Sequence, residues 1–145
     1  MEANILTRMH SAEHLLNSTM VKMFACNRSF SAHINKKKSK CDYHFKRPLT
    51  IDEIAEIEKR VNDIIQKNLP VTEALLRRED ANQQFNLERL PESVGDEVRI
   101  IRIGDYDAIP CIGEHIQSTG EIKGFKITTV DFENGILRIR FKITK

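Results

Sequence analysis

Two pairs of potential metal ligands, far apart in the chain, place the strongest constraint on its fold. His10 and His14 are four residues apart, and Cys111 and His115 repeat that spacing. Imidazole and thiolate are ligands that zinc prefers, and three histidines with one cysteine fill a tetrahedron. The two pairs can share one ion only if the folded chain brings them together. The sequence therefore predicts a Zn²⁺ site built from two remote segments.

The first pair lies within a segment of helical periodicity. Between residues 7 and 24, apolar side chains recur at helical spacing and form one stripe, which consists of Met9, Ala12, Leu16, Met20 and Met23. Residues four apart on a helix project from the same side, so His10 and His14 can reach one ion. We therefore predict an amphipathic helix that carries both imidazoles beside its apolar stripe.

The rest of the chain predicts a second helix and several strands. Thr50 and Glu53 form a capping-box signal, and an apolar helix face continues to Pro70. A short helix is expected near residues 80–85. Segments rich in β-forming residues predict strands at 29–34, 41–45, 71–76, 98–103, 122–130 and 136–143. Helices first and strands late indicate an α+β fold, a largely antiparallel β-sheet with helices packed on one face.

Length and cysteine content limit the class of protein. A chain of 145 residues has the usual size of one domain, and we assign residues 1–145 to a single domain. The cysteines Cys26, Cys41 and Cys111 are odd in number and irregularly spaced, which argues against a disulfide framework and fits a reducing compartment. No apolar run approaches the roughly 20 residues that cross a bilayer, and the start lacks a secretion signal. We expect a cytoplasmic protein with no membrane partner and no obligate protein partner.

Basic residues are clustered, although the formal net charge is only +2. The clusters are Lys36, Lys37 and Lys38 in the turn between the first two strands, Arg77 and Arg78, and Arg138 and Arg140 on one face of the last strand. Single charges of this kind usually keep a protein in solution. A collective patch predicts contacts with phosphates and an RNA affinity that falls steeply with added salt.

Two motifs resemble a known family. Residues 10–16, HSAEHLL, resemble the H-x-x-x-H-L-L opening of the second additional domain of threonyl- and alanyl-tRNA synthetases, which is shared with the AlaX proteins. Residues 111–122, CIGEHIQSTGEI, are similar to the second motif of that family, C-x-G-x-H-V-x-x-T-G-x-I. Residues 68–71, 104–105 and 137–141 also fit, so the likeness covers nearly the whole chain. Because the helix with His10 starts almost at the N-terminus, the expected match is the short, freestanding form of AlaX.

One departure from the family bears on specificity. Alanyl enzymes and many AlaX members carry Gly-Gly-Thr between the cysteine and the histidine of the second motif, whereas this chain has Ile112, Gly113 and Glu114. These residues belong to the expected pocket wall. The accepted amino acid is therefore the part of the function that the resemblance specifies least.

The resemblance implies an ATP-independent hydrolase that edits aminoacyl-tRNA, with the acceptor end of a wrongly charged tRNA as its partner. The preferred substrate is alanine tRNA that carries serine or glycine, and threonine tRNA that carries serine comes next. The catalytic and metal-binding residues are His10, His14, Cys111 and His115. With an open coordination position, zinc polarises the ester or activates water; with four protein ligands, it orients substrate or holds the two halves together.

Five residues are candidates for supporting roles. Ser29 and Ser31 alternate on a strand, so both hydroxyls can face a pocket and bind the hydroxyl of a serine substrate. Gly113 either lets its backbone amides approach the substrate or forms only a tight turn. Glu13 and Glu114, each next to a proposed ligand, are candidates for a general base or for a group that orients a ligand.

Two other functions stay open. Residues 10–14 also fit the H-x-x-E-H pattern of inverzincin metallopeptidases, although that class gives no role to Cys111 and His115. The chain can also be a noncatalytic module that binds tRNA or another partner, with a structural zinc or none. Metal analysis and deacylation assays of the protein and of His10→Ala separate an enzyme from such a module.

Overall fold

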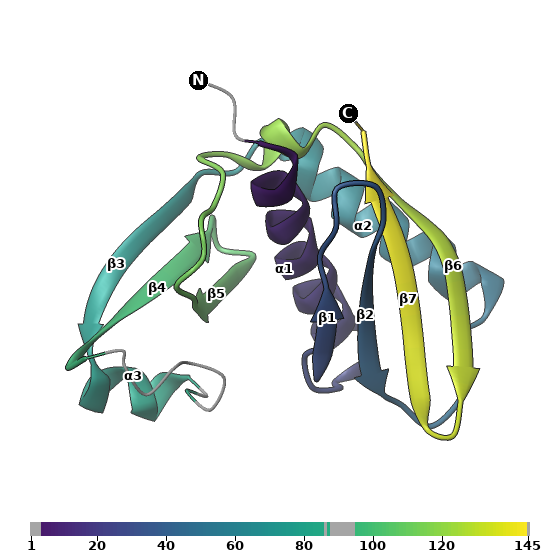
Figure 1. The fold of residues 1–145 in the computed structure, drawn as a ribbon, viewed down its shortest axis with the longest axis horizontal. Helices are drawn as coiled ribbons and strands as arrows, with labels where there is room; N and C mark the ends of the chain where they lie inside the picture. The colour runs from purple at the N-terminus through teal and green to yellow at the C-terminus, as the bar shows by residue number, and fades with distance from the viewer. Residues whose placement is uncertain (1–3, 86, 88–94, 145) are drawn as a thin grey trace.

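Helix α1 (Ile5–Phe24) is the central element of the computed structural model, which describes residues 4–85, 87 and 95–144 (Figure 1). The Asn4 side chain caps the helix by accepting a hydrogen bond from the Thr7 amide at 2.9 Å. Nearly every residue from Thr7 to Met20 is buried. The predicted helix is therefore confirmed, but it is covered on more sides than a single apolar stripe requires.

A four-stranded antiparallel sheet lies on one side of α1 (Figure 1). Its strand order is β1 (Ser31–His33), β2 (Ser39–His44), β7 (Ile136–Ile143) and β6 (Phe125–Glu133). Alternate residues of each strand face the helices and form the main core, among them Cys41, Tyr43, Leu137, Ile139 and Phe141. The opposite face carries the polar and charged side chains of these strands.

Helix α2 (Ile51–Lys67) packs against α1 and β6 and begins at the predicted capping box. Glu53 N donates to Thr50 Oγ1 at 3.1 Å, and Thr50 N donates to Glu53 Oε1 at 2.9 Å. The helix ends at Asn68, which adopts the left-handed conformation. Its buried residues, Ile57, Val61, Ile64 and Ile65, lie on the predicted apolar face.

The other strands form a separate three-stranded antiparallel sheet, in the order β3 (Val71–Arg77), β4 (Glu97–Ile103) and β5 (Asp107–Pro110). Helix α3 (Arg78–Gln84) covers one face of it through a small apolar cluster around Ala81, Val98 and Ile100. The α+β class is confirmed, and the strands are divided between two antiparallel sheets with α1 between them (Figure 1). Strand β5 has only four residues and was not predicted.

The strand predicted at 122–130 begins later than expected. Residues Thr119–Ile122 form the 3-10 helix η1, and β6 begins only at Phe125. Lys123 has a positive φ of 74°, which interrupts the extended backbone between the two elements. The buried Arg8 of α1 then holds this segment, because its guanidinium donates to the carbonyl oxygens of Glu121, Ile122 and Thr144.

None of the helices in the described part of the chain combines the length and the apolar composition of a membrane span.

Candidate metal centre

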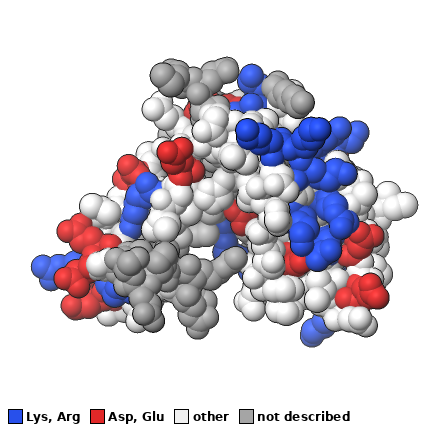
Figure 2. All heavy atoms as spheres, viewed as in Figure 1, with Lys and Arg blue, Asp and Glu red and all other residues white. Residues whose placement is uncertain are grey.

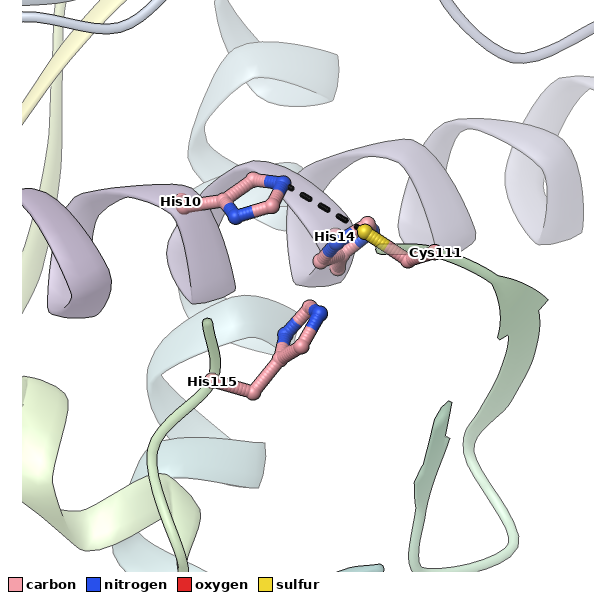
Figure 3. Close-up of side chains that lie close together, drawn as sticks. All are labelled: His10, His14, Cys111 and His115. Carbon is pink, nitrogen blue, oxygen red and sulfur yellow. Dashed lines mark hydrogen bonds between the residues drawn. The ribbon is translucent and has the colours of Figure 1, made fainter. Parts of the chain in front are cut away.

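The four predicted ligands lie in one cluster (Figure 3). Potential ligand atoms of His10, His14, Cys111 and His115 are all within 4.8 Å of one another. The three imidazole rings have centroid separations between 4.6 and 5.0 Å. Helix α1 supplies the first two residues, and the segment that follows β5 supplies the other two. The N-terminal helix and the Cys111 turn are therefore close enough for one ion to contact both.

Buried ring nitrogens show that this cluster fits a metal ion. His14 Nε2 and both ring nitrogens of His115 are buried and have no hydrogen-bond partner within the described residues. A buried polar atom without a partner is costly, and an ion is one of the few groups that can satisfy it. One nitrogen of each imidazole carries a lone pair, and these nitrogens together with the sulfur of Cys111 form a donor set that suits zinc.

The local electrostatics favour the metal-binding form of the cysteine. Burial acts to raise the pKa of Cys111, but the neighbouring imidazoles of His10, His115 and His14 outweigh it and lower the pKa to about 3. The hydrogen bond with Cys111 is also the main reason that the pKa of His10 is raised, whereas burial lowers the pKa of His115. A thiolate is the form of cysteine that binds metals. The cluster therefore holds a deprotonated sulfur at neutral pH.

Charged side chains flank the two histidines of α1. Arg28 forms a bidentate ion pair with Asp107, and its Nη2 lies 3.5 Å from His14 Nδ1. On the other side, the buried carboxylate of Glu13 lies 3.7 Å from His10 Nε2. Ring orientation at a metal site depends on such neighbours. Arg28 and Asp107 had no signal in the sequence, because only the fold brings them to His14.

A known protein family matches the part of the chain that carries Cys111 and His115. Residues 98–140, which include Cys111 and His115, match the family described as "Threonyl and Alanyl tRNA synthetase second additional domain". The chain belongs to the second additional domain family. The first motif lies outside the matched residues, but similarity to individual relatives extends over most of the chain.

This second additional domain is similar to part of several alanine–tRNA ligases. It is 33% identical to the ligase of Neisseria gonorrhoeae over 140 residues, which are 92% of the chain. It is 34% identical to that of Petrotoga mobilis over 132 residues, or 90% of the chain. It is 31% identical to that of Methanopyrus kandleri over 140 residues, or 94% of the chain. The chain spans about 15% of the length of each of these relatives.

Gly113 lies directly against the imidazole of His10, one of the candidate metal ligands. A Cβ atom on Gly113 would lie 2.7 Å from Cε1 and 3.1 Å from Nδ1 of His10. Distances below 3.0 Å are essentially never found for real Cβ atoms. The close backbone approach at Gly113 is therefore an approach to the imidazole of His10.

The two predicted serines differ in their surroundings. Ser29 is buried, and its amide donates to Asn17 Oδ1 at 2.9 Å; Asn17 in turn donates to Glu13 Oε1 at 3.1 Å. Ser31 is exposed on β1. A polar network therefore connects Ser29, but not Ser31, with the carboxylate beside His10.

A cleft of about 570 Å³ opens beside His115. Glu114 lines it and is exposed, and Thr7 Oγ1 donates to its carboxylate at 3.4 Å. Arg99 of β4 lines the same cleft and was not selected from the sequence, where it is one of several charged residues in a strand.

The predicted basic residues occupy unequal environments. Lys36, Lys37 and Lys38 are exposed at the turn between β1 and β2. Arg138 forms a bidentate ion pair with Asp42, at 2.7 and 2.9 Å, and Arg140 pairs with Asp131 at 2.8 Å. Lysine and arginine side chains gather over the turn and the neighbouring strands in Figure 2. Part of the positive charge on this face is neutralised by its own carboxylates.

Proposed function

We propose that this second additional domain is a zinc-dependent aminoacyl-tRNA hydrolase that removes wrong amino acids from tRNA. The observation that carries the proposal is the convergence of His10, His14, Cys111 and His115, with three unpartnered ring nitrogens, next to an open cleft. Similarity to alanine–tRNA ligases supports alanine tRNA charged with serine or glycine as the preferred substrate. Threonine tRNA charged with serine is the second candidate. A cytoplasmic site of action accords with such substrates.

The residues of the cluster hold the ion and determine the net charge of the site. With one coordination position open to substrate or water, a bound zinc ion would polarise the ester carbonyl or lower the pKa of a water molecule; with all four residues bound, it would orient substrate or hold the two segments together. The Cys111 thiolate provides one negative charge, and the three imidazoles provide neutral donors. Glu13 lies where its carboxylate can orient His10. This arrangement requires no ATP.

Neighbouring residues bind the aminoacyl group in our proposal. Glu114 lines the cleft beside His115, where its carboxylate can accept hydrogen bonds from the α-ammonium group or a proton from water. The backbone around Gly113 approaches the reacting ester, and the hydroxyls of Ser29 and Ser31 recognise the hydroxyl of a serine substrate. Ser29 is better placed than Ser31, because it is linked through Asn17 to Glu13.

The acceptor arm of tRNA binds through cations on the four-stranded sheet. Lys36, Lys37 and Lys38 contribute the exposed charge, and Arg138 and Arg140 contribute guanidinium groups, although each is already paired with a carboxylate. Phosphate contacts of this type fix the position of an RNA without reading its sequence. Specificity then comes from the aminoacyl pocket and from the end of the acceptor arm.

The decisive experiment is a panel of mischarged tRNAs incubated with the purified chain alone and without ATP. We expect release of serine or glycine from alanine tRNA, loss of that activity in His10→Ala, and full activity in the control His33→Ala, whose imidazole is exposed on β1. Metal analysis of both variants accompanies the assay. Because the chain is added by itself, activity also tests whether it acts in trans.

A noncatalytic module predicts a different result. Such a protein binds tRNA but releases no amino acid from any member of the panel. If zinc is structural, His10→Ala unfolds; if zinc is catalytic, the variant stays folded and inactive. Circular dichroism of the variant distinguishes these cases. Peptide hydrolysis without deacylation would contradict the proposal in favour of a metallopeptidase.

A further inference from the structure

Four lysines from remote parts of the chain surround a hollow of about 570 Å³ on the four-stranded sheet. Lys36 and Lys37 come from the β1–β2 turn, Lys126 from the start of β6, and Lys142 from the end of β7. None of the described residues that line the hollow is an aspartate or a glutamate. The positive charge is therefore concentrated rather than balanced within this hollow.

The pairing of β6 with β7 brings two of these lysines close together, which is electrostatically unfavourable. Lys126 and Lys142 are directly opposite each other in the antiparallel β6–β7 pairing, where two like charges are destabilising. Within residues 4–85, 87 and 95–144, no ion pair engages any of the four lysines, whereas Arg138 and Arg140 are each paired. An anion in the hollow would offset the repulsion between Lys126 and Lys142 and would pair with the lysines of the turn.

The first turn of α1 lies between the lysine-lined region and the cleft beside His115. Lys36 and Lys37 also line a neighbouring depression that includes Leu6. Thr7, the next residue of α1, lines the cleft beside His115. In Figure 2, basic side chains cover the region where Figure 1 shows the β1–β2 turn and the nearby end of β7. The lysines and the cleft therefore border the same turn of α1, and a polyanion bound at the lysines would have to pass around that turn to reach the cleft.

We propose that the hollow lined by Lys36, Lys37, Lys126 and Lys142 binds phosphates of the single-stranded 3′ end of tRNA and directs that end to the metal centre. The inference rests on the proposed function, because an ester at the metal centre fixes the position of the terminal ribose. Lysine ammonium groups bind phosphates as point charges without sequence preference. The lysines therefore contribute affinity and position, while the aminoacyl pocket contributes specificity.

The test compares Lys126→Gln/Lys142→Gln with the control Lys46→Gln/Lys67→Gln, which removes the same charge from exposed positions elsewhere. Binding of alanine tRNA without an attached amino acid is measured by fluorescence anisotropy between low and high salt. Each lost phosphate contact on a single strand lowers the slope of log affinity against log salt by about 0.7, so we expect a decrease of about 1.4 for the first variant only. In deacylation assays, KM rises and kcat is unchanged.

The outcomes separate the two proposals. Equal affinity and salt slope in the two double variants would overturn the lysine site while leaving the hydrolase intact. Absence of tRNA binding by the unmodified protein would instead remove the proposed function. Binding to vesicles of anionic phospholipid, with no binding to tRNA, would assign the hollow to a membrane surface and contradict the RNA site.

An independent set of contacts concerns the turn that carries Cys111. Strand β5 ends at Pro110, and the Cys111 amide makes the last bond to β4, with the carbonyl oxygen of Arg99 at 3.2 Å. The side chain of Arg99 also binds this turn. Its Nε donates to the carbonyl oxygen of Cys111 at 3.0 Å, and its Nη2 donates to that of Gly113. One residue of β4 therefore holds three backbone groups of the turn.

These contacts act on both halves of the metal centre. Cys111 is a ligand, and Gly113 packs against the ring of His10. The third interaction of the guanidinium, with Glu73 at 3.1 Å, is with a side chain that is 62% exposed and adds little attachment. The two carbonyl contacts are therefore the ones that fix the turn.

We further infer that Arg99 is the positioning residue of the metal centre, because it holds the Cys111 turn at the distance from α1 that a shared ion requires. This role of Arg99 requires the metal site of the proposed function, but it does not require hydrolysis. Residues that orient metal ligands typically change metal affinity by about 10- to 100-fold when they are replaced. Lysine at this position has one ammonium group and cannot reach both carbonyl oxygens as a planar guanidinium does.

Cobalt(II) alone is the probe for this inference. Visible absorption titrations compare the unmodified protein with Arg99→Gln, Arg99→Lys and the control Glu73→Gln. We expect cobalt affinity to fall by about tenfold or more in Arg99→Gln, to be intermediate in Arg99→Lys, and to be unchanged in Glu73→Gln. Hydrogen exchange in the metal-free protein should become faster at residues 112–114 in Arg99→Gln, but not at β7, whose exchange rate reports global stability.

Unchanged cobalt affinity and spectrum in Arg99→Gln would overturn the role of Arg99. If the unmodified protein binds no cobalt, the metal site of the proposed function fails. The exchange rates at residues 112–114 then still decide whether Arg99 holds the turn.

Discussion

At the scale of single residues, the metal centre is limited by space as well as by charge. Gly113 has room for a hydrogen atom only, because the ring of His10 occupies the position of a Cβ atom. The thiolate of Cys111 and the unpartnered nitrogens of His14 and His115 complete the arrangement. A substitution that leaves all four ligands in place can therefore still disrupt the site.

We predict that Gly113→Ala lowers zinc affinity by about tenfold or more, because the added methyl group pushes the His10 ring away from the cluster. Competition with a chromophoric chelator measures this affinity. The matched control is Gly95→Ala, since a Cβ atom on Gly95 meets no atom within 4 Å. Equal zinc affinities of the two variants would contradict the close packing of Gly113 on His10.

A second prediction at this scale concerns pH. Asp42 is only 5% exposed, and hydrogen bonds from Arg138 hold its pKa below the usual value. A carboxyl group with a lowered pKa stabilises the folded state above its unfolded pKa, and this contribution disappears as the pH falls through its folded pKa. Asp42→Asn should therefore cost about 1 to 2 kcal/mol of unfolding free energy at neutral pH. The difference should shrink below about pH 4.

Urea denaturation at a series of pH values measures this dependence. Asp131→Asn is the control, because the Asp131–Arg140 pair is more exposed and should change stability by no more than about 0.5 kcal/mol. A pH-independent loss of stability in Asp42→Asn would show that its charge is not the stabilising feature.

At the scale of elements, the two long helices have different relations to solvent. Helix α1 is buried between the two sheets and carries half of the metal centre, whereas α2 has one buried face and an exposed start. The start of α2 is therefore stabilised mainly by local contacts. Thr50 and Glu53 exchange backbone and side-chain hydrogen bonds there.

We predict that Thr50→Ala lowers the free energy of unfolding by about 1 kcal/mol, because an N-terminal amide of α2 loses its hydrogen-bond acceptor. Chemical denaturation of the purified variant measures the loss. Thr50→Ser retains the hydroxyl group and should restore most of the stability. A serine variant as unstable as the alanine variant would assign the effect to the lost methyl group instead of the cap.

At the scale of the whole molecule, the metal centre joins two parts of the chain that have separate apolar clusters. The larger cluster includes α1, α2, the four-stranded sheet and Ile103 at the end of β4, and the smaller one lies between α3 and the three-stranded sheet. His10 and His14 belong to an element of the first part, and Cys111 follows the last strand of the second. An ion shared by all four ligands would therefore crosslink α1 with the segment that follows the three-stranded sheet.

We predict that a chelator lowers the melting temperature but leaves the protein folded at room temperature, because the larger core does not contain the ion. An ion that binds only the folded state stabilises it by about 4 kcal/mol when its free concentration is a thousand times its dissociation constant. Calorimetry with and without chelator measures the shift, and His10→Ala should show none. A chelator that removes the metal without changing the melting temperature would contradict the crosslink.

Patterns of neighbouring residues were enough to predict the helices. The stripe beside His10 and His14 and the capping box at Thr50 depend on contacts three or four positions apart, so their sequences determine them. The same holds for the spacing within each ligand pair. Both pairs were therefore recognisable before the fold was known.

Only the tertiary structure decided how remote segments meet. The strands form two sheets, β5 is present although it was not predicted, and β6 begins only at Phe125. The side chain of Arg99 contacts the Cys111 turn. The tertiary structure also pairs Arg138 with Asp42 and brings Lys126 and Lys142 to the basic turn. These features depend on strand register and packing between residues far apart in sequence, which local periodicity does not specify.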